Sequence, residues 1–399
     1  MNPLNPFFAI VIFLIVFGTA YLINLKYKFS NDNVRFETID GLRGFLAFGV
    51  FIHHSAIWFQ FLQIKSWELP KSNLYSHLGQ TSVSFFFMIT AFLFVTKLLN
   101  TNKEIDWNAI FISRFFRLVP MYFVSLLVLV LIVFIISNWE LKVTFTELVK
   151  ELFYWVTFTI FGTPSINTYS NTSIINAGVV WSLPYEWLFY FSLPVISLLM
   201  LKKVNSIMYL IISIIFIVLF YKFKGANIHH FLSFAGGAIS PFLIKYGPKK
   251  IKYDSAFFSI IILLCLASIL YFPTPNSFYC KFLIIVIFNL VVLGNSIFGI
   301  LKNSTLKFLG EISYSTYLIH GIILFIVMYF IFGFEKATSL SPTEFCITIF
   351  IITPLVVLAS FLSYKKIEHP FMVYSKKYLR KRQNVKQELL EKQGEMYTK

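Results

Sequence analysis

The sequence predicts an all-α protein, a polytopic bundle of about eleven transmembrane helices. Of its 399 residues, 57% are hydrophobic and only 13% are charged, whereas soluble domains carry roughly 25% charged residues. Apolar runs of membrane-spanning length recur along the chain, and the basic residues cluster between them. No polar stretch is long enough to form a separate soluble domain.

Windows of about 20 apolar residues predict the individual spans. These are residues 7–25, 42–64, 82–99, 118–138, 183–201, 206–221, 231–245, 256–272, 281–301, 314–333 and 345–364. We expect residues 7–25 to be a retained span added to a ten-span core, because no basic residue precedes them and no small-residue cleavage site follows. Residues 152–162 are apolar but too short to cross, so we expect a re-entrant or interfacial segment.

Loop charge predicts the orientation. If residues 152–162 do not span, the Lys- and Arg-rich loops all fall on one side, which is then the cytoplasmic side. The formal charge of +16 is therefore an orientation signal rather than a nucleic-acid-binding face. We expect a multi-pass protein of the cytoplasmic (inner) membrane, with its C-terminus in the cytoplasm and a long outer lid. Its expected parts are an extra helix (1–30), a membrane domain (31–371) and a basic cytoplasmic tail (372–399).

The most informative polar residues lie in one apolar helix. Asp40, Arg43 and the adjacent pair His53 and His54 occupy the second span and its start. At 100° per residue, His54 returns to within about 20° of Arg43 and about 40° of Asp40. Asp40, Arg43 and His54 therefore form a polar stripe along one side of the helix. Because ionisable groups cost about 2.5–3.5 kcal/mol each inside a bilayer, this stripe predicts a functional cavity. The alternative is a hydrogen bond from the histidines to a neighbouring helix.

Three further motifs carry polar side chains at the ends of spans. Arg114 and Arg117 are three residues apart, so they share a helix face and can fork onto phosphate oxygens or snorkel to lipid headgroups. Glu186 follows Trp181 and Ser182 and needs a buried partner, for which His54 or Arg43 is suitable. The third motif contains residues that fall on or near one helix face: Ser313, Tyr314, Tyr317 and His320.

The three cysteines and the final motif add less. Cys265, Cys280 and Cys346 lie in separate apolar segments and form neither a disulfide framework nor a metal signature. In Ile367-Glu368-His369-Pro370-Phe371, we expect Pro370 to stop the last helix near its cytoplasmic end.

Taken together, these motifs resemble the acyltransferase type 3 family of membrane O-acyltransferases. The matching pieces occur in family order: Arg35…Ile39-Asp40-Gly41-Leu42-Arg43-Gly44…His54, Arg114-x-x-Arg117-x-x-Pro120, Trp181-Ser182-Leu183-x-x-Glu186, Ser313-Tyr314-x-x-Tyr317-Leu318-x-His320 and Ile367-Glu368-x-Pro370. The chain departs from the family at Thr90-Ala91-Phe92, where many relatives have Ser-Gly-Phe. Some relatives carry a hydrolase domain after the last span; none follows here, so we expect the membrane domain to handle the acceptor alone or with a partner.

The resemblance implies a donor, an acceptor and a set of roles. The donor is acetyl-CoA or a related acyl-CoA from the cytoplasm, no cofactor is permanently bound, and the acceptor is a glycan or a lipid-linked sugar. His54 is the family's catalytic histidine, and Asp40 and Arg43 tune and orient it. Glu186 supports the acceptor or the histidine, and Arg114 and Arg117 hold the CoA phosphates or position the thioester carrier. Substrate binding falls to the remaining motif residues: His53, Trp181, Ser182, Tyr314, Tyr317 and His320.

Two other classes of protein share some of these features. A proton-coupled exporter of a glycan or small molecule also has many spans and a protonatable site near the midplane, although the chain lacks the internal repeat of many transporters. A sensor or assembly scaffold would carry the polar stripe without turnover. Transfer of label from acetyl-CoA separates the enzyme from both.

Overall fold

The computed structural model describes residues 2–27, 36–101, 105–201, 206–225 and 227–397, with side chains as far as Val385. Within these ranges the chain consists of helices and connecting turns, and strand-like pairing is limited to one isolated bridge between Ile166 and Tyr169. The predicted all-α class is therefore confirmed. Arg35, which opens the first expected motif, lies outside the described residues.

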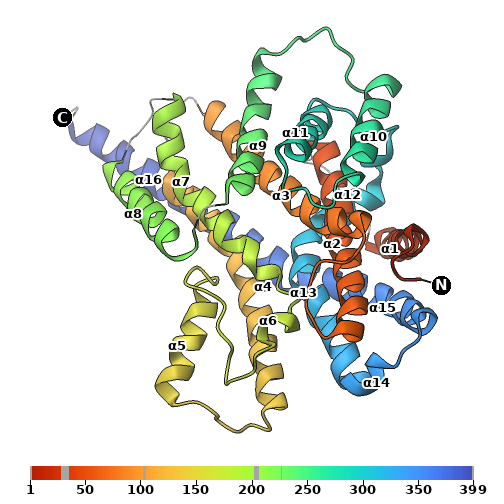
Figure 1. Cartoon of the computed structure of the whole chain (residues 1–399). Coiled ribbons are helices and arrows are strands. Elements are labelled where there is room, and N and C mark those ends of the chain that lie inside the picture. Colours follow the sequence, from red (N-terminus) through yellow and green to blue (C-terminus); the bar gives the residue numbers. More distant parts are fainter. Residues whose placement is uncertain (1, 28–35, 102–104, 202–205, 226, 398–399) are drawn as a thin grey trace.

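The helices follow one another with mostly short connections (Figure 1). The first group is α1 (Pro6–Tyr27), α2 (Glu37–Ile64), α3 (Asn73–Leu99) and α4 (Trp107–Ile136). The central group is α5 (Phe145–Val156), α6 (Thr172–Ile175), η1 (Val179–Ser182), α7 (Leu183–Leu201), α8 (Ile207–Phe223), α9 (Ile228–Tyr246), α10 (Ala256–Leu270) and α11 (Phe278–Val292). The last group is η2 (Ile300–Lys302), α12 (Ser304–Glu311), α13 (Ser313–Ile326), η3 (Val327–Ile331), α14 (Phe334–Thr338), α15 (Pro342–Ser363), η4 (Tyr364–Glu368) and α16 (His369–Tyr397).

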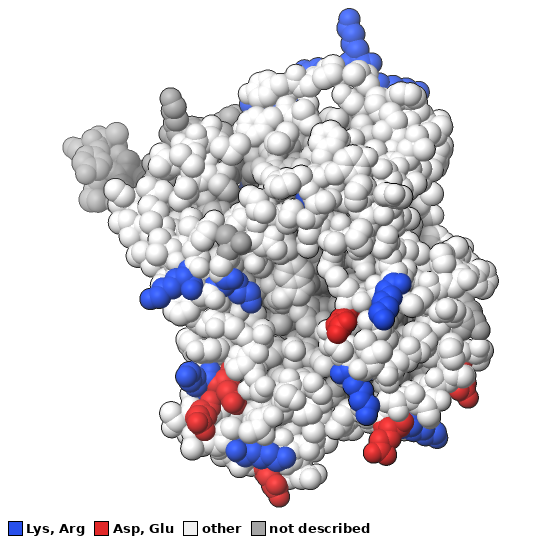
Figure 2. Space-filling model, viewed as in Figure 1, with Lys and Arg blue, Asp and Glu red and all other residues white. Residues whose placement is uncertain are grey.

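Several of these helices can cross a bilayer. In the described part of the chain, seven are long and apolar enough: α1 to α4, η1 with α7, α13 with η3, and α15 continued by η4 and α16. The apolar helices α8, α10 and α11 are shorter. Each of the eleven expected spans coincides with a helix, but their number remains a prediction. Figure 2 shows a broad uncharged band on the visible face, with charged side chains below it and at the upper edge.

Helix α2 is the central element of the bundle. In its most apolar window 94% of the residues are buried, compared with 28% in α1, which lies at the periphery. Every residue from Leu46 to Leu62 is buried in α2, including both histidines. A polar stripe on this helix therefore faces other helices and not lipid.

Glycines let α2 and α12 approach each other closely. A Cβ on Gly310 of α12 would lie 2.0 Å from the backbone oxygen of Asp40, and one on Gly44 would lie 2.5 Å from that of Leu306. No larger residue fits without moving a backbone. A second close contact joins α9 to α3, where a Cβ on Gly237 would lie 2.1 Å from the Met88 oxygen. Near the Thr90-Ala91-Phe92 departure, the close approach is therefore provided by the glycine of the partner helix.

Two predicted helix ends were wrong. The span expected at 281–301 ends as a helix at Val292, because the chain turns at Gly294 and Gly299, whose φ values are +111° and +85°. Pro370 does not stop the last helix. The five residues Tyr364–Glu368 form a π-helical segment, and α16 then begins at His369. Pro370 lies in the first turn of α16, where a missing N–H is tolerated.

Polar contacts join the helix ends that were expected to share the cytoplasmic side. Lys307 forms an ion pair with Glu37 at 3.0 Å, and Arg382 of α16 reaches Asp106 before α4 at 3.5 Å. Lys302 bonds Asp254 at 2.8 Å. Hydrogen bonds from Lys302 and then Ser296 lower the pKa of the Asp254 carboxyl to about 2. These basic segments therefore gather around the starts of α2 and α4.

The segment between α4 and α7, the expected outer lid, has an ordered structure of its own. The short helix α5 begins with a capping box between Thr144 and Glu147. The buried side chain of Asn167 accepts a hydrogen bond from the Lys142 N–H and donates to the Glu140 oxygen. Residues 152–162 contain the end of α5 followed by turns, and α5 has only 12 residues. This segment is too short to span, as expected.

Candidate active site

The stripe on α2 faces α13. Arg43 donates a hydrogen bond to the Ser313 hydroxyl at 3.0 Å and lies 3.6 Å from the Asp40 carboxylate. Eleven residues further along α2, Nδ1 of His54 lies 3.0 Å from Nε2 of His320. The helical period thus places Arg43 and His54 against the same neighbouring helix, and the His54 ring does not point at lipid.

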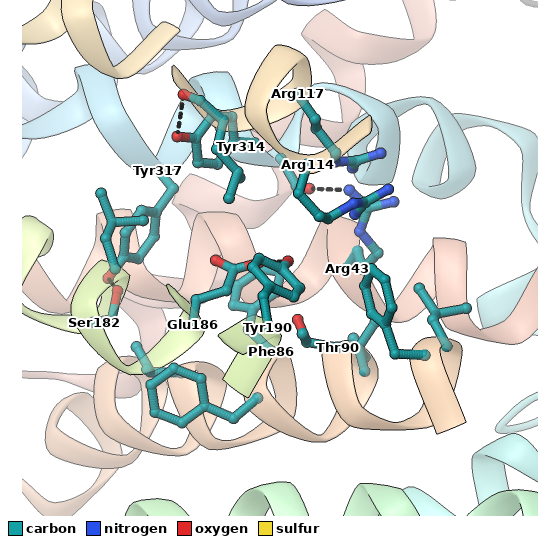
Figure 3. Close-up of a pocket in the computed structure, with 18 residues that line it drawn as sticks. Arg43, Phe86, Thr90, Arg114, Arg117, Ser182, Glu186, Tyr190, Tyr314 and Tyr317 are labelled. Carbon is teal, nitrogen blue, oxygen red and sulfur yellow. Dashed lines mark hydrogen bonds between the residues drawn. The ribbon is translucent and has the colours of Figure 1, made fainter. Parts of the chain in front are cut away.

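A cavity opens beside the Arg43 end of this stripe. It occupies about 920 Å³ including its open mouth, and α2, α3, α4, α7 and α13 all contribute to its lining. Figure 3 shows the guanidinium groups of Arg43, Arg114 and Arg117 together at one end, with Ser182 and Tyr317 at the other. Glu186 and Tyr190 lie between the two ends. The sequence motifs, distant along the chain, therefore meet in one cavity.

Arg114 and Arg117 reach the cavity from α4, which begins eleven residues earlier than the expected span. The Arg114 guanidinium lies over the Phe94 ring at 5.0 Å and the Tyr190 ring at 6.0 Å. Its Nε is buried and has no hydrogen-bond partner among the described residues. A guanidinium held by aromatic rings with an unused donor is suited to bind an anion such as a phosphate group.

Glu186 has a different partner from the one expected. Its carboxylate accepts a hydrogen bond from the hydroxyl of Tyr190, one turn later on the same helix. Neither His54 nor Arg43 forms the expected pair with it in the described structure. The sequence could not identify Tyr190, because an aromatic residue four positions along an apolar helix is also an ordinary packing residue.

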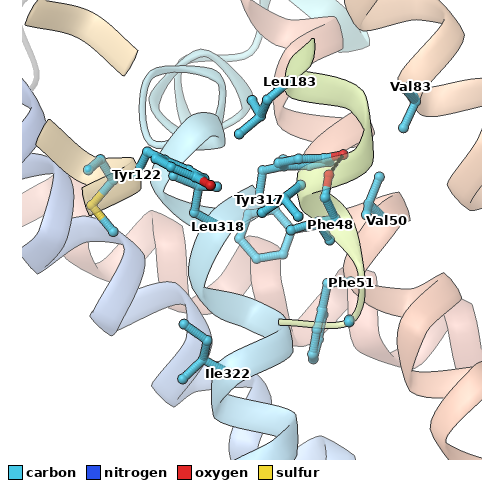
Figure 4. Packing of buried hydrophobic residues seen from close by; sticks show 14 of the residues in the cluster. Phe48, Val50, Phe51, Val83, Tyr122, Leu183, Tyr317, Leu318 and Ile322 are labelled. Carbon is cyan, nitrogen blue, oxygen red and sulfur yellow. Dashed lines mark hydrogen bonds between the residues drawn. The ribbon is translucent and has the colours of Figure 1, made fainter. Parts of the chain in front are cut away.

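Tyr317 lies at the end of the cavity opposite the arginines (Figure 3). Its hydroxyl donates to the Val179 oxygen at 2.8 Å and accepts from the Ser182 hydroxyl at 2.8 Å. Around it pack apolar side chains of α2 and α7, among them Phe48, Phe51 and Leu183 (Figure 4). Tyr314, one turn earlier, lines the cavity and donates to the Leu118 oxygen at 2.8 Å.

The histidines lie beyond this tyrosine. The rings of Tyr317 and His320 are 6.4 Å apart. None of the three histidines, His53, His54 and His320, is part of the cavity lining. His53 points away from His320, toward α3, where its Nδ1 bonds the Tyr75 oxygen at 2.7 Å. A Cβ on Gly79 would lie 2.3 Å from its ring. The structure thus brings His54 and His320 together and holds His53 in a packing position.

Trp181 also lies outside the cavity lining. Its ring packs against His230 at 5.0 Å and against Tyr185 and Phe87 at 6.2 and 6.3 Å. This aromatic group was not visible in the sequence, because His230 comes from α9 and Phe87 from α3.

The sequence motif containing Glu368 gave no role for this residue, but the structure places it close to the cavity. Glu368 is 1% exposed and accepts a hydrogen bond from Ser315 at 2.9 Å, while its second oxygen has no partner among the described residues. Its charge acts on Arg117. Within the described residues, no three His, Cys, Asp or Glu side chains are grouped as metal ligands.

Comparisons with known proteins agree with the resemblance. The family model described as "Acyltransferase domain" matches residues 36–364. Relatives named "Putative O-acetyltransferase" in Staphylococcus aureus strains COL, MSSA476 and MRSA252 are each 27% identical to it over 367 residues. The match covers 84% of this chain and 56% of theirs, so the chain spans about half the length of these curated relatives. No solved structure matches.

The family match includes all the cavity-lining residues and both members of the histidine pair. It also extends over most of the chain, from just before α2 to the end of α15. The chain therefore belongs to the acyltransferase type 3 family.

Proposed function

We propose that this protein is an integral-membrane O-acyltransferase. It moves an acetyl or related acyl group from cytoplasmic acyl-CoA to a hydroxyl of a cell-envelope glycan or lipid-linked sugar. The observation that carries the proposal is the three-arginine cavity, whose far end lies one tyrosine ring from a buried histidine pair. An anion site joined to a proton acceptor suits a phosphate-bearing donor and a hydroxyl acceptor.

The arginine end of the cavity binds the donor. Arg114 and Arg117 hold phosphate oxygens of CoA, and Arg43 adds a third positive charge that Asp40 and Ser313 keep in place. Guanidinium groups bind phosphate with two parallel hydrogen bonds, which fixes direction as well as position. The acyl thioester then extends toward Tyr317.

The reaction takes place at His54. As general base, the neutral imidazole takes the acceptor's hydroxyl proton while that oxygen attacks the thioester carbon; the C–S bond breaks and the proton leaves with the thiolate. As nucleophile, the imidazole itself attacks the thioester carbon, and the C–S bond breaks as the thiolate leaves. The acceptor oxygen then attacks the acyl-imidazole, the C–N bond breaks, and the acceptor's hydroxyl proton goes to the thiolate. In both routes Tyr317 must move aside, because it lines the cavity next to His320 while His54 itself is not part of the lining.

The acceptor approaches from the lid side. Ser182, Tyr314 and Glu186 present hydroxyl and carboxylate groups to the cavity. Trp181 offers an aromatic face for a sugar ring, although it now packs against His230. We place the protein in the cytoplasmic membrane, with the arginine end and α16 toward the cytoplasm and the lid outside.

The test is transfer of label from radiolabelled acetyl-CoA in membranes that contain the protein. We expect label in a glycan fraction and at least a hundredfold lower rate for His54→Ala, because general bases contribute about 10²–10⁴-fold. His77→Ala is the matched control. His77 is another buried membrane histidine that bonds a backbone oxygen, at 2.8 Å from Phe272, and it should keep the wild-type rate per folded molecule.

Two results would contradict the proposal. Wild-type transfer by His54→Ala would remove the histidine from the reaction. Protein-dependent export of a glycan without transfer of label would favour the exporter instead. Comparing glycan masses from cells with and without the gene then identifies the acyl group and its carrier.

A further inference from the structure

The pair formed by His54 and His320 contains a directional chain of hydrogen bonds. Nδ1 of His320 lies 2.9 Å from the carbonyl oxygen of Thr316, one turn earlier on α13. Nε2 of the same ring lies 3.0 Å from Nδ1 of His54. His320 is 0% exposed, so no bulk water competes for either nitrogen.

The backbone carbonyl of Thr316 determines which nitrogens of the two imidazole rings carry a hydrogen. A carbonyl oxygen only accepts, so Nδ1 of His320 carries the hydrogen. A neutral imidazole has a single N–H, which leaves a lone pair on Nε2 of His320 to accept from His54. The bound hydrogen of His54 is therefore on Nδ1, and its Nε2 is left with the lone pair. If His320 were protonated, its Nε2–H would face the Nδ1–H of His54, and two donors cannot form a hydrogen bond with each other.

Packing keeps the two rings in this relation. The Trp67 ring stacks on His54 with an interplanar angle of 15°, and the Phe51 ring meets His320 edge-on at 6.3 Å. Next to His320 on α13, a Cβ on Gly321 would lie 2.5 Å from the Asn176 backbone, so this part of the helix packs closely against the lid. His53 cannot replace His320, because its Nδ1 bonds the Tyr75 oxygen.

We propose that His320 is a positioning residue that holds His54 in the tautomer with a free Nε2 lone pair. This inference rests on the proposed function, in which that lone pair takes a proton or attacks the thioester. When Nε2 of His54 takes the proton, the new imidazolium still donates from Nδ1 to the lone pair of neutral His320. We call the hydrogen-bonded chain from the Thr316 carbonyl through His320 to His54 the relay. It orients the His54 ring and stabilises its charged form, and His320 touches no substrate.

The test compares two substitutions of similar size. His320→Leu removes the imidazole acceptor of His54 and leaves that ring only its interaction with the Val50 backbone, one turn earlier on α2, whereas His320→Gln can place a carbonyl oxygen near the position of Nε2. With radiolabelled acetyl-CoA and membranes, we expect His320→Leu to lower kcat about 10- to 100-fold, as loss of a group that orients another does. The KM for acetyl-CoA should stay within about twofold, and His320→Gln should recover most of the kcat.

The outcomes separate a relay from simple packing. Thermal unfolding in detergent first shows whether both variants are folded. If they are, equal losses of kcat in the two would overturn the relay, and so would a wild-type kcat in His320→Leu. If His320→Leu does not fold, His320→Gln alone decides, because a residual kcat under a tenth of wild type contradicts the proposal. The His54→Ala result is independent: if that variant is inactive while His320→Leu is fully active, only the relay fails.

Discussion

At the scale of single residues, two of the three cavity arginines, Arg43 and Arg114, differ in what holds them. Arg43 has an ion pair with Asp40 and a hydrogen bond to Ser313. Arg114 lies over aromatic rings, and its buried Nε has no partner in the described structure. A ligand anion therefore gains most at Arg114, because part of its hydrogen-bonding capacity is unused.

We predict that Arg114→Lys weakens donor binding. Lysine keeps the charge but loses the planar fork and the stacking on Phe94. The KM for acetyl-CoA should rise about tenfold, which corresponds to about 1.4 kcal/mol, with kcat changed less. Initial rates at varied acetyl-CoA concentration measure this.

Arg382→Lys provides the matched control for Arg114→Lys. It makes the same change in an exposed pair with Asp106, where ion pairs contribute roughly 0–1 kcal/mol. An unchanged KM together with a large fall in kcat for Arg114→Lys would contradict donor binding at this residue.

At the scale of elements, the crossing of α2 and α12 sets the position of the stripe. The backbone of Asp40 lies directly against Gly310, so the start of α2 is fixed by a contact with no side chain between the helices. Lys307, also on α12, forms an ion pair with Glu37 beside this contact. The short helix α12 thus holds the end of α2 that carries Asp40 and Arg43.

We predict that Gly310→Ala destabilises the protein by about 1–3 kcal/mol, because its methyl group would overlap the Asp40 carbonyl 2.0 Å away. The melting temperature in detergent should fall, and transfer activity should fall with it as Arg43 shifts. In the control Gly18→Ala, nothing lies within 4 Å of the new Cβ in the exposed part of α1. That variant should melt at or slightly above the wild-type temperature. Equal melting temperatures for both variants would show that the crossing tolerates a methyl group.

Helix ends were harder to predict than helices. Apolar length correctly predicted α11 but extended it past Gly294, because residues 293–301 are mostly apolar although the backbone turns there. Pro370 was misread because the π-helical segment before it shifts the hydrogen-bond register. Whether a proline interrupts a helix depends on the position it takes in that helix, which its sequence neighbours do not determine.

At the scale of the whole molecule, the basic segments gather at the end of the bundle where the arginine cavity lies. The helix α16 packs along α4, with Tyr374 against Phe116 and Arg382 next to Asp106. The lid and the loop after α2 lie at the opposite ends of these helices. By the positive-inside rule, this gathering favours the proposed orientation, in which the arginine end faces the cytoplasm.

We predict that a reporter fused after Lys399 is active only if it works in the cytoplasm. A green fluorescent protein fusion should fluoresce, and an alkaline phosphatase fusion at the same position should be inactive. A phosphatase inserted in the lid at Lys142, an exposed position before α5, should be active. The reverse pattern at both positions would place the donor cavity on the wrong side for cytoplasmic acyl-CoA.

The sequence by itself determined the all-α membrane class, the helices, and the residues of the stripe, because hydrophobic length and the 3.6-residue period are local properties. It also determined the family, through five short motifs in order. Only the tertiary structure decided which polar groups meet. It paired His54 with His320, and it put Tyr317 in the cavity lining with its ring 6.4 Å from that of His320. Those contacts depend on how helices far apart in sequence cross, and this is set by small residues such as Gly310 and by packing over the whole bundle.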